Sequence, residues 1–206
     1  MKHEWRKHEK EYYVPKEKPE IRTIPRFKFF MISGKGDPNG ERYSEEIAAL
    51  YSLSYAIKML PKNKIIPDGY FDYTVYPLEG IWDLTDSGKQ QPGLNKDELV
   101  YTIMIRQPDF VTDELFQMVL KSVKKKKPNK YLDSVTFSSM EDGLSVQMMH
   151  VGSYDEEPES FALMEKYCMD NNLVIKKDVH HREIYLSDAR RVEPSKLKTV
   201  LRYMVK

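Results

Sequence analysis

Residues 26–40 read RFKFFMISGKGDPNG, an apolar run followed by a turn-rich run. Its first eight residues are rich in aromatic and aliphatic side chains, and its last seven are almost all turn formers. This change predicts a strand that ends in a loop. A helix is predicted over residues 43–60, because apolar and aromatic residues recur there at helical spacing and Pro61 cannot continue it. Tyr51 and Tyr55 share one face of that helix.

The chain continues with two more predicted strands, residues 70–82 and 98–106, which are rich in aromatic and β-branched side chains. A connector helix is then expected over residues 112–125. Thr112 is its expected N-cap, and acidic residues occupy its first turn. The first half of the chain therefore has the order strand, helix, strand, strand.

The second half repeats this order, with a strand at 143–152, a helix at 159–171 and strands at 173–177 and 180–187. The two units, residues 26–106 and 143–187, predict an α+β fold in which duplicated strand-helix-strand-strand units form a pseudo-twofold antiparallel sheet with helices on one side. A last helix is expected over residues 194–204, because Pro194 suits the first helical position and apolar residues follow at spacings of three and four.

Residues 1–20 alternate Lys, Glu and Pro with little apolar periodicity. This composition predicts an extended N-terminal arm. The folded domain is therefore expected to span residues 21–206.

The composition excludes several classes of function. The 206 residues carry 33 Lys and Arg against 32 Asp and Glu, a net charge of +1, so no strong field favours nucleic acid or an anionic membrane. No stretch approaches the ~20 apolar residues of a spanning helix, and the N-terminus lacks the apolar core of a signal peptide. The single cysteine, Cys168, excludes a disulfide framework. We expect a cytoplasmic protein.

Several motifs have simpler structural explanations. Residues 34–36, Gly-Lys-Gly, lack the third glycine of a dinucleotide fingerprint, so a tight turn is favoured. The lysine run at 121–130 suits the solvated C-terminal end of a helix. His180 and His181 point to opposite faces of a strand, so with His150 they form an incomplete metal-ligand set. Cys168 lies on the apolar stripe of a helix, which favours buried packing. No motif predicts a metal or an organic cofactor.

Glu183 is the strongest candidate for chemistry. Strand alternation places it on one face with His181 and Tyr185, while Ile184 and Leu186 occupy the other face. We expect the two aliphatic residues to lie on the core face beneath the helices and Glu183 to lie on the opposite face. A solvated glutamate would be ordinary. A functional role requires aromatic walls around the carboxylate.

The sequence contains residues that suit such walls, and we assign these to the lining of a ligand groove: Tyr51, Tyr55, Trp82, Tyr101, Met104, Met148, His150 and Tyr154. A carboxylate among aromatic and methionine side chains attracts a flat cation through Coulomb and cation-π interactions. Burial would also raise the pKa of the carboxyl group and make it a better base.

The chain resembles the GyrI-like small-molecule-binding family. The resemblance is carried by several ordered blocks: FKFFMISGKGDPNG, IAALYSLSYAIKM, YPLEGIW, YTIMIRQPDFVTDEL, HVGSYDEEP and HHREIYLSDARRVEPSKLKTVLR. The resemblance covers about residues 8–206. It implies a stand-alone member of the family. The family is expected to share its fold with the effector-binding domains of multidrug-responsive transcription regulators. Tyr101 stands where tryptophan is expected in close relatives, and Ala189 stands where proline is common.

The resemblance implies that the two halves form a central groove for aromatic, often cationic, compounds, with Glu183 at the position of the family's pocket glutamate. Some stand-alone members hydrolyse cyclopropane-bearing DNA-alkylating compounds and so protect the cell. On this hypothesis Glu183 orients or deprotonates a water molecule, and Tyr185 or Tyr154 donates a hydrogen bond to the oxygen that gains charge.

Three functions stay open from the sequence. The protein is a binding and sequestering protein for aromatic small molecules, a hydrolase of strained cyclopropane electrophiles, or a regulatory protein that holds a macromolecular partner. A shared fold does not decide among them. The sequence leaves the oligomeric state open.

Overall fold

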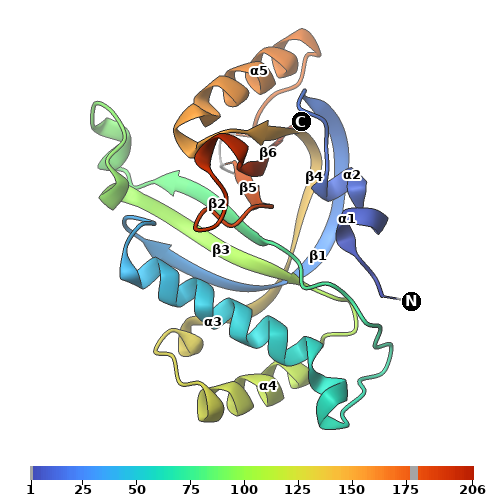
Figure 1. The fold of residues 1–206 in the computed structure, drawn as a ribbon. Helices are drawn as coiled ribbons and strands as arrows, with labels where there is room; N and C mark the ends of the chain where they lie inside the picture. Colours follow the sequence, from blue (N-terminus) through green and yellow to red (C-terminus); the bar gives the residue numbers. More distant parts are fainter. Residues whose placement is uncertain (1, 177–180) are drawn as a thin grey trace. The chain divides into compact units, whose positions relative to one another are not determined.

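The computed structural model describes residues 2–176 and 181–206 (Figure 1). Within this part of the chain the strands are β1 (Glu20–Lys35), β2 (Leu78–Leu84), β3 (Leu99–Gln107), β4 (Thr136–Val151), β5 (Arg182–Tyr185) and β6 (Lys198–Met204). The α-helices are α1 (Trp5–His8), α2 (Lys10–Tyr13), α3 (Glu41–Lys58), α4 (Asp113–Lys126) and α5 (Glu157–Asp170). The strands are hydrogen-bonded in the closed order β1-β3-β2-β5-β6-β4. The predicted α+β class is confirmed.

The chain divides into two compact units. The first consists mainly of residues 27–78 and 83–140, and the second mainly of residues 5–26, 79–82 and 141–206. No α-helix of the described residues is long and apolar enough to cross a membrane.

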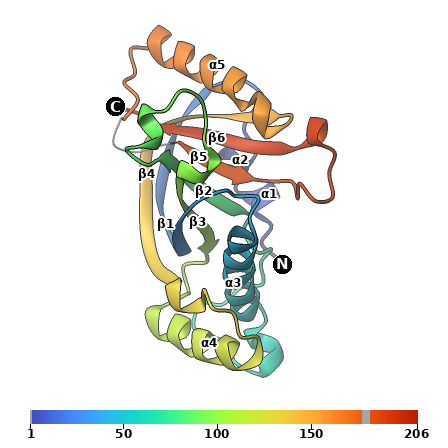
Figure 2. The same cartoon turned by 90° about the vertical axis from the view of Figure 1, so that its left-hand side faces the viewer.

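In the first unit, β1 and β3 form an antiparallel pair from Lys28 opposite Gln107 to Lys35 opposite Val100. Helix α3 packs on β3 and lies beside α4, as both ribbon views show (Figures 1 and 2). Its buried stripe includes Leu50, Leu53 and Ile57, which are inaccessible to solvent. The predicted helix at 43–60 is therefore confirmed.

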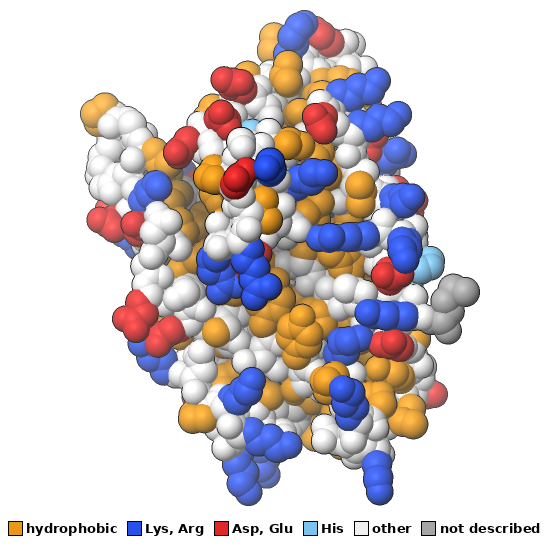
Figure 3. Space-filling model, in the orientation of Figure 1, with side chains coloured by type: hydrophobic (Ala, Val, Ile, Leu, Met, Phe, Trp, Pro, Cys, Tyr) orange, Lys and Arg blue, Asp and Glu red, His pale blue; other side chains and the backbone are white. Residues whose placement is uncertain are grey.

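Helix α4 confirms the predicted connector at 112–125. The Thr112 hydroxyl accepts a hydrogen bond from the Leu115 amide at 3.2 Å, as expected of an N-cap. Lys124, Lys125 and Lys126 occupy the last turn. Lysine and arginine side chains gather on the surface at this end of the helix (Figure 3), so the expected solvated helix end is confirmed.

In the second unit, β6 pairs with β4 on one side and with β5 on the other, both antiparallel. Helix α5 lies along one face of these strands (Figures 1 and 2). The core beneath it consists of Val146, Met148, Met164, Cys168, Leu201 and Val205. The predicted burial of Cys168 is confirmed, because only 2% of this residue is exposed.

The opposite face of the same strands buries charge. Arg182 donates to Glu79 at 3.0 Å and to Asp142 at 2.6 Å, and Arg202 donates to Asp142 at 2.9 Å. These four side chains are all at least 96% buried. Burial disfavours ionisation of Asp142, but the two guanidinium groups outweigh it and hold its pKa below the usual range.

The prediction of an extended arm over residues 1–20 is wrong for residues 5–13, which form α1 and α2. Trp5 and Tyr13 are 4% and 2% exposed, and their ring centroids lie 5.3 Å apart. Arg202 anchors this segment by donating to the carbonyl oxygen of Tyr12 at 2.9 Å. Arg202 is distant in sequence from residues 5–13, so local periodicity could not indicate this contact.

The predicted C-terminal helix at 194–204 is also wrong. Residues 194–196 form one 3-10 turn, and residues 198–204 form strand β6. Four consecutive residues, 199–202, are buried, because β6 lies between two strands and both of its faces are covered. The apolar members of such a doubly buried strand happened to show the spacing of a helix.

Three predicted strands are shorter than expected. Of residues 70–82, only those from Leu78 onward join β2, because Pro77 has no N–H group to extend the ladder. Of residues 173–177, Ile175 forms an isolated bridge with Val205. The predicted strand at 180–187 is also shorter than expected, because only Arg182–Tyr185 form β5; His180 lies outside the described residues.

The order strand-helix-strand-strand is found as β1-α3-β2-β3 and again as β4-α5-β5-β6. The second set ends at Met204, whereas the predicted repeat ended at 187. The pseudo-twofold relation between the two sets and the groove between them stay predictions.

Candidate functional site

Strand β5 places Glu183 on the face of the second unit that α5 covers. Glu183 lies opposite Leu201 of β6, and Leu201 belongs to the core beneath α5. The predicted alternation is correct, because Arg182 points to the other face and binds Asp142 there. The predicted assignment of the faces is wrong: Glu183 lies on the helix-covered face, and only 9% of it is exposed.

Both carboxylate oxygens of Glu183 have hydrogen-bond partners. The Tyr185 hydroxyl donates to Oε2 at 2.7 Å, and His181 Nε2 lies 2.7 Å from Oε1. The His181 ring packs against Phe161 of α5, with 4.7 Å between ring centroids. Two such contacts suit a carboxylate, which accepts hydrogen bonds at both oxygens.

Trp82 extends this chain of hydrogen bonds from the neighbouring strand β2. Its indole Nε1 donates to the Tyr185 hydroxyl at 2.7 Å. Gly80, two residues earlier, makes this possible. A Cβ atom at Gly80 would lie 2.6 Å from Trp82 Nε1 and 3.2 Å from the Tyr185 hydroxyl. The absence of a side chain therefore lets the indole reach across to Tyr185.

Glu157, in the first turn of α5, supplies a second carboxyl group. It is 6% exposed, and no described group hydrogen-bonds its buried Oε1. Burial first, and then the negative charge of Glu183, raises the pKa of Glu157 well above its usual range. The site thus combines a buried carboxyl group whose pKa is raised with a second carboxyl group, that of Glu183, whose two oxygens both have hydrogen-bond partners.

Tyr154 lies in the 3-10 turn that precedes α5, and its ring meets the Tyr185 ring edge to face at 6.0 Å between centroids. Tyr154 is 41% exposed, and the partial burial of its ring, followed by the charges of Glu157, Glu183 and Asp188, raises its pKa. Its hydroxyl therefore keeps its proton and can donate a hydrogen bond.

The structure brings together four of the predicted residues, which together with Glu157 we call the acid–base cluster: Trp82, Tyr154, Glu183, Tyr185 and Glu157. Sequence reasoning missed Glu157. It lies in the acidic run Asp155–Glu157 at a helix start, where acidic residues are ordinary because they complement the helix dipole. Only its burial distinguishes it from exposed Glu159.

Met148 and His150 lie on β4 of the same unit. Met148 is 3% exposed and packs in the core beneath α5. His150 is 5% exposed, and its ring nitrogens contact the carbonyl oxygen of Ser153, before α5, and the hydroxyl oxygen of Ser160, within α5. Their role in lining a groove stays a prediction.

The remaining predicted lining residues belong to the first unit. Tyr51 and Tyr55 lie along α3 with ring centroids 6.2 Å apart, and Tyr55 is 52% exposed. Tyr101 is buried, and its hydroxyl donates to Glu46 at 2.8 Å. Met104 is fully buried. Their contribution to a ligand site also stays a prediction.

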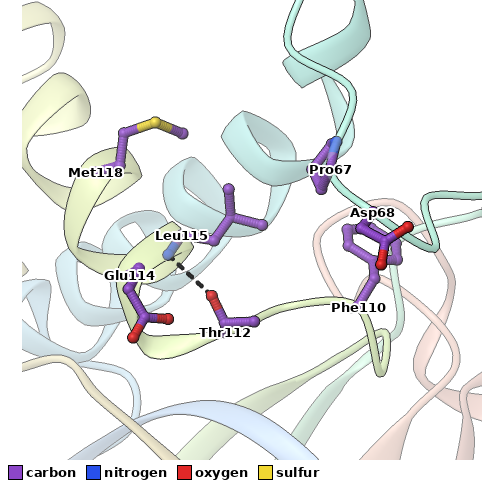
Figure 4. A pocket seen from close by; sticks show the side chains of 7 residues that line it. All are labelled: Pro67, Asp68, Phe110, Thr112, Glu114, Leu115 and Met118. Carbon is purple, nitrogen blue, oxygen red and sulfur yellow. Dashed lines mark hydrogen bonds between the residues drawn. The ribbon is translucent and has the colours of Figure 1, made fainter.

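The first unit also contains an open pocket of about 300 Å³ at the start of α4 (Figure 4). Thr112 and Leu115 border it, and their side-chain-to-backbone hydrogen bond caps the helix. The other lining residues are Pro67, Asp68, Phe110, Glu114 and Met118. None of the predicted site residues lines this pocket.

Comparison with known proteins identifies the family. Residues 17–206 match the family described as the GyrI-like small molecule binding domain. The chain belongs to the GyrI-like family. No curated protein matches this GyrI-like domain.

Two solved structures described as a hydrolase from Listeria innocua are 38% and 39% identical to this GyrI-like domain. Their TM-scores are 0.90 and 0.92, and they match 99% and 100% of this chain over 100% of their own. The C-terminal domain of EcmrR has a TM-score of 0.53 at 12% identity, over 92% of this chain and 97% of that domain. At that identity the likeness concerns the fold alone.

Proposed function

We propose that this GyrI-like domain binds a flat, hydrophobic small molecule at the acid–base cluster and hydrolyses a strained cyclopropane ring in it. The observation that carries the proposal is a buried Glu157, whose Oε1 has no hydrogen-bond partner among the described groups, beside a Glu183 whose two oxygens are both hydrogen-bonded. Two carboxyl groups in different protonation states supply an acid and a base at one pH. The Listeria structures described as hydrolases support the reaction class.

Glu183 acts as the base. Its Oε1 and Oε2 atoms are held by His181 and Tyr185, so the carboxylate has one defined orientation. It removes a proton from water as the water oxygen forms a bond to the ring CH₂ carbon. The C–C bond of the cyclopropane breaks, and its electron pair moves through the conjugated system to a carbonyl oxygen, which gains negative charge.

Glu157 acts as the acid. It gives its proton to that oxygen, while the raised pKa of Tyr154 keeps the Tyr154 hydroxyl available as a hydrogen-bond donor to the same oxygen. The product is the substrate plus one water molecule. The proton gained by Glu183 balances the proton lost by Glu157, so the pair resets by transferring one proton and needs no other reactant.

Trp82 forms a wall of the site. The indole is 93% buried, and its N–H group is bonded to Tyr185, so its ring plane is fixed before a ligand arrives. A fixed aromatic surface reduces the entropy lost when a planar ligand stacks on it. Negative charge at Glu183 would additionally favour cationic ligands.

The test is incubation with a cyclopropane-bearing alkylator of the duocarmycin type, followed by mass spectrometry of the small molecule. We expect many molecules of the water adduct per protein molecule, and at least a hundredfold slower turnover in Glu183→Gln and Glu157→Gln. Glu159→Gln is the matched control, because Glu159 lies on the same helix and is exposed. It should turn over normally.

Two outcomes would overturn the reaction. An unchanged compound that binds the protein would leave a binding and sequestering protein. Undiminished turnover in both glutamine variants would remove the acid–base pair from the mechanism.

A further inference from the structure

The segment that carries Tyr154 and Glu157 is held at two points by one buried side chain, His150. Nε2 of its ring lies 2.9 Å from the carbonyl oxygen of Ser153, and Nδ1 lies 2.9 Å from the hydroxyl oxygen of Ser160. Ser153 precedes Glu157 by four residues and Ser160 follows it by three. The two anchor points therefore lie before and after Glu157 in the sequence.

The contact with Ser153 fixes which ring nitrogen carries hydrogen. A carbonyl oxygen can only accept, so Nε2 must donate to it. In the neutral ring Nδ1 then accepts the hydroxyl hydrogen of Ser160. If the ring gains a second proton, the Ser160 hydroxyl can accept instead, so both contacts persist in either charge state of His150.

The turn at residues 152–156 lies close to the imidazole ring of His150. Ser153 and Glu156 form a capping box, in which the Ser153 amide donates to Glu156 Oε2 at 2.8 Å. Gly152 has a φ of +149°, and a Cβ atom there would lie 2.7 Å from Glu156 Oε2 and 3.2 Å from His150 Nε2. Glycine is therefore required for the turn to pass this close to the imidazole.

The strand register relates His150 to the acid–base cluster. Thr199 of β6 is the cross-strand partner of His150 on one side and of Tyr185 on the other. The three residues form one row across the sheet, on the face that α5 covers. His150 thus has a fixed position relative to Tyr185, and through its two contacts it fixes the segment that carries Tyr154 and Glu157.

We propose that His150 is a positioning residue that holds Glu157 and Tyr154 against Glu183 and Tyr185. This inference deepens the proposed function and rests on it for the chemistry, but the positioning itself is testable without turnover. The positioning role needs no contact between His150 and a ligand, because both ring nitrogens engage Ser153 and Ser160.

The test measures the protonation of Glu157 directly, by ¹³C NMR of protein labelled at the Glu side-chain carboxyl carbons. The Glu157 signal is assigned by its loss in Glu157→Gln. The high titration midpoint of this signal depends on burial beside Glu183. A displaced Glu157 would therefore titrate at lower pH, whether or not the protein hydrolyses anything.

We expect the midpoint to fall by at least one pH unit in Ser160→Ala and further in His150→Ala. His150→Gln retains a donor toward the Ser153 carbonyl, so it should restore part of the shift. Cys168→Ala is the matched control, because it weakens packing of the same helix within the apolar core. Its melting temperature should fall while the Glu157 midpoint stays at the wild-type value.

An unchanged midpoint in folded Ser160→Ala and His150→Ala would overturn the proposal. A midpoint that falls equally in Cys168→Ala would also overturn it, since the effect would then come from general loosening of α5. Failure of the hydrolysis assay alone would contradict the proposed reaction and leave this result standing.

Discussion

The indole N–H of Trp82 donates to the hydroxyl of Tyr185, 2.7 Å away, and that hydroxyl donates in turn to Glu183. One phenol therefore connects the aromatic wall of the site to its carboxylate. Removing the phenol hydroxyl would take this acceptor from the buried indole N–H and one partner from Glu183.

We predict that Tyr185→Phe lowers the free energy of unfolding by about 1–3 kcal/mol, because it removes the hydrogen bonds that the hydroxyl makes with Trp82 and Glu183. Trp82→Phe removes the indole donor, so the double variant should cost less than the sum of the two single variants, by about 1 kcal/mol. Urea denaturation of the four proteins measures this. Strict additivity would show that the Trp82–Tyr185 bond contributes nothing to stability.

Gly80→Ala should displace the Trp82 ring, because the new methyl group would lie 2.6 Å from Nε1 in the present structure. We expect a loss of about 1–3 kcal/mol from overpacking. In a Trp82→Ala background the same substitution should cost much less. Equal costs in the two backgrounds would place the strain elsewhere in β2.

Glu157→Gln should change how stability depends on pH. Because the pKa of Glu157 is raised in the folded state, to about 9, the folded protein binds more protons than the unfolded chain between about pH 4.5 and 9. The stability that protonated Glu157 contributes is fully present below about pH 4.5 and is lost as the pH rises to about 9. The variant should gain stability relative to wild type as pH rises, and a constant difference in melts at pH 5, 7 and 9 would contradict this.

Asp142→Asn should be strongly destabilising. Asp142 neutralises Arg182 and Arg202 at distances of 2.6 and 2.9 Å in a buried network. Removing one partner of a buried ion pair costs about 3–5 kcal/mol, because the remaining charge is uncompensated. Exposed Asp133→Asn is the control, with a cost near zero expected from the same denaturation experiment.

Local patterns predicted much of the fold. The turn-rich stretch after residue 33 correctly marked the end of a strand, and Thr112 correctly marked the start of α4. The segments predicted wrongly depend on long-range contacts. Residues 198–204 form a strand only because strands lie on both sides of them, and residues 5–13 are ordered by partners such as Arg202.

The candidate site shows the same division. Alternation correctly placed His181, Glu183 and Tyr185 on one face, since it depends only on backbone geometry. Alternation could not decide which face α5 covers. The face opposite Glu183 carries both an aliphatic residue, Ile184, and a buried charged residue, Arg182, so its composition does not mark it as core or surface. Glu157 has no sequence signature that separates it from the exposed acids around it.

Consecutive residues of β5 serve two different purposes. Arg182 belongs to the buried ion-pair network, and Glu183 belongs to the acid–base cluster on the reverse side. The ion pairs of Arg182 hold the strand from the face opposite the acid–base cluster. Residues 181, 183 and 185 take no part in these ion pairs. Substitutions at these three positions would therefore change the acid–base cluster while the ion pairs of Arg182 with Glu79 and Asp142 stay in place.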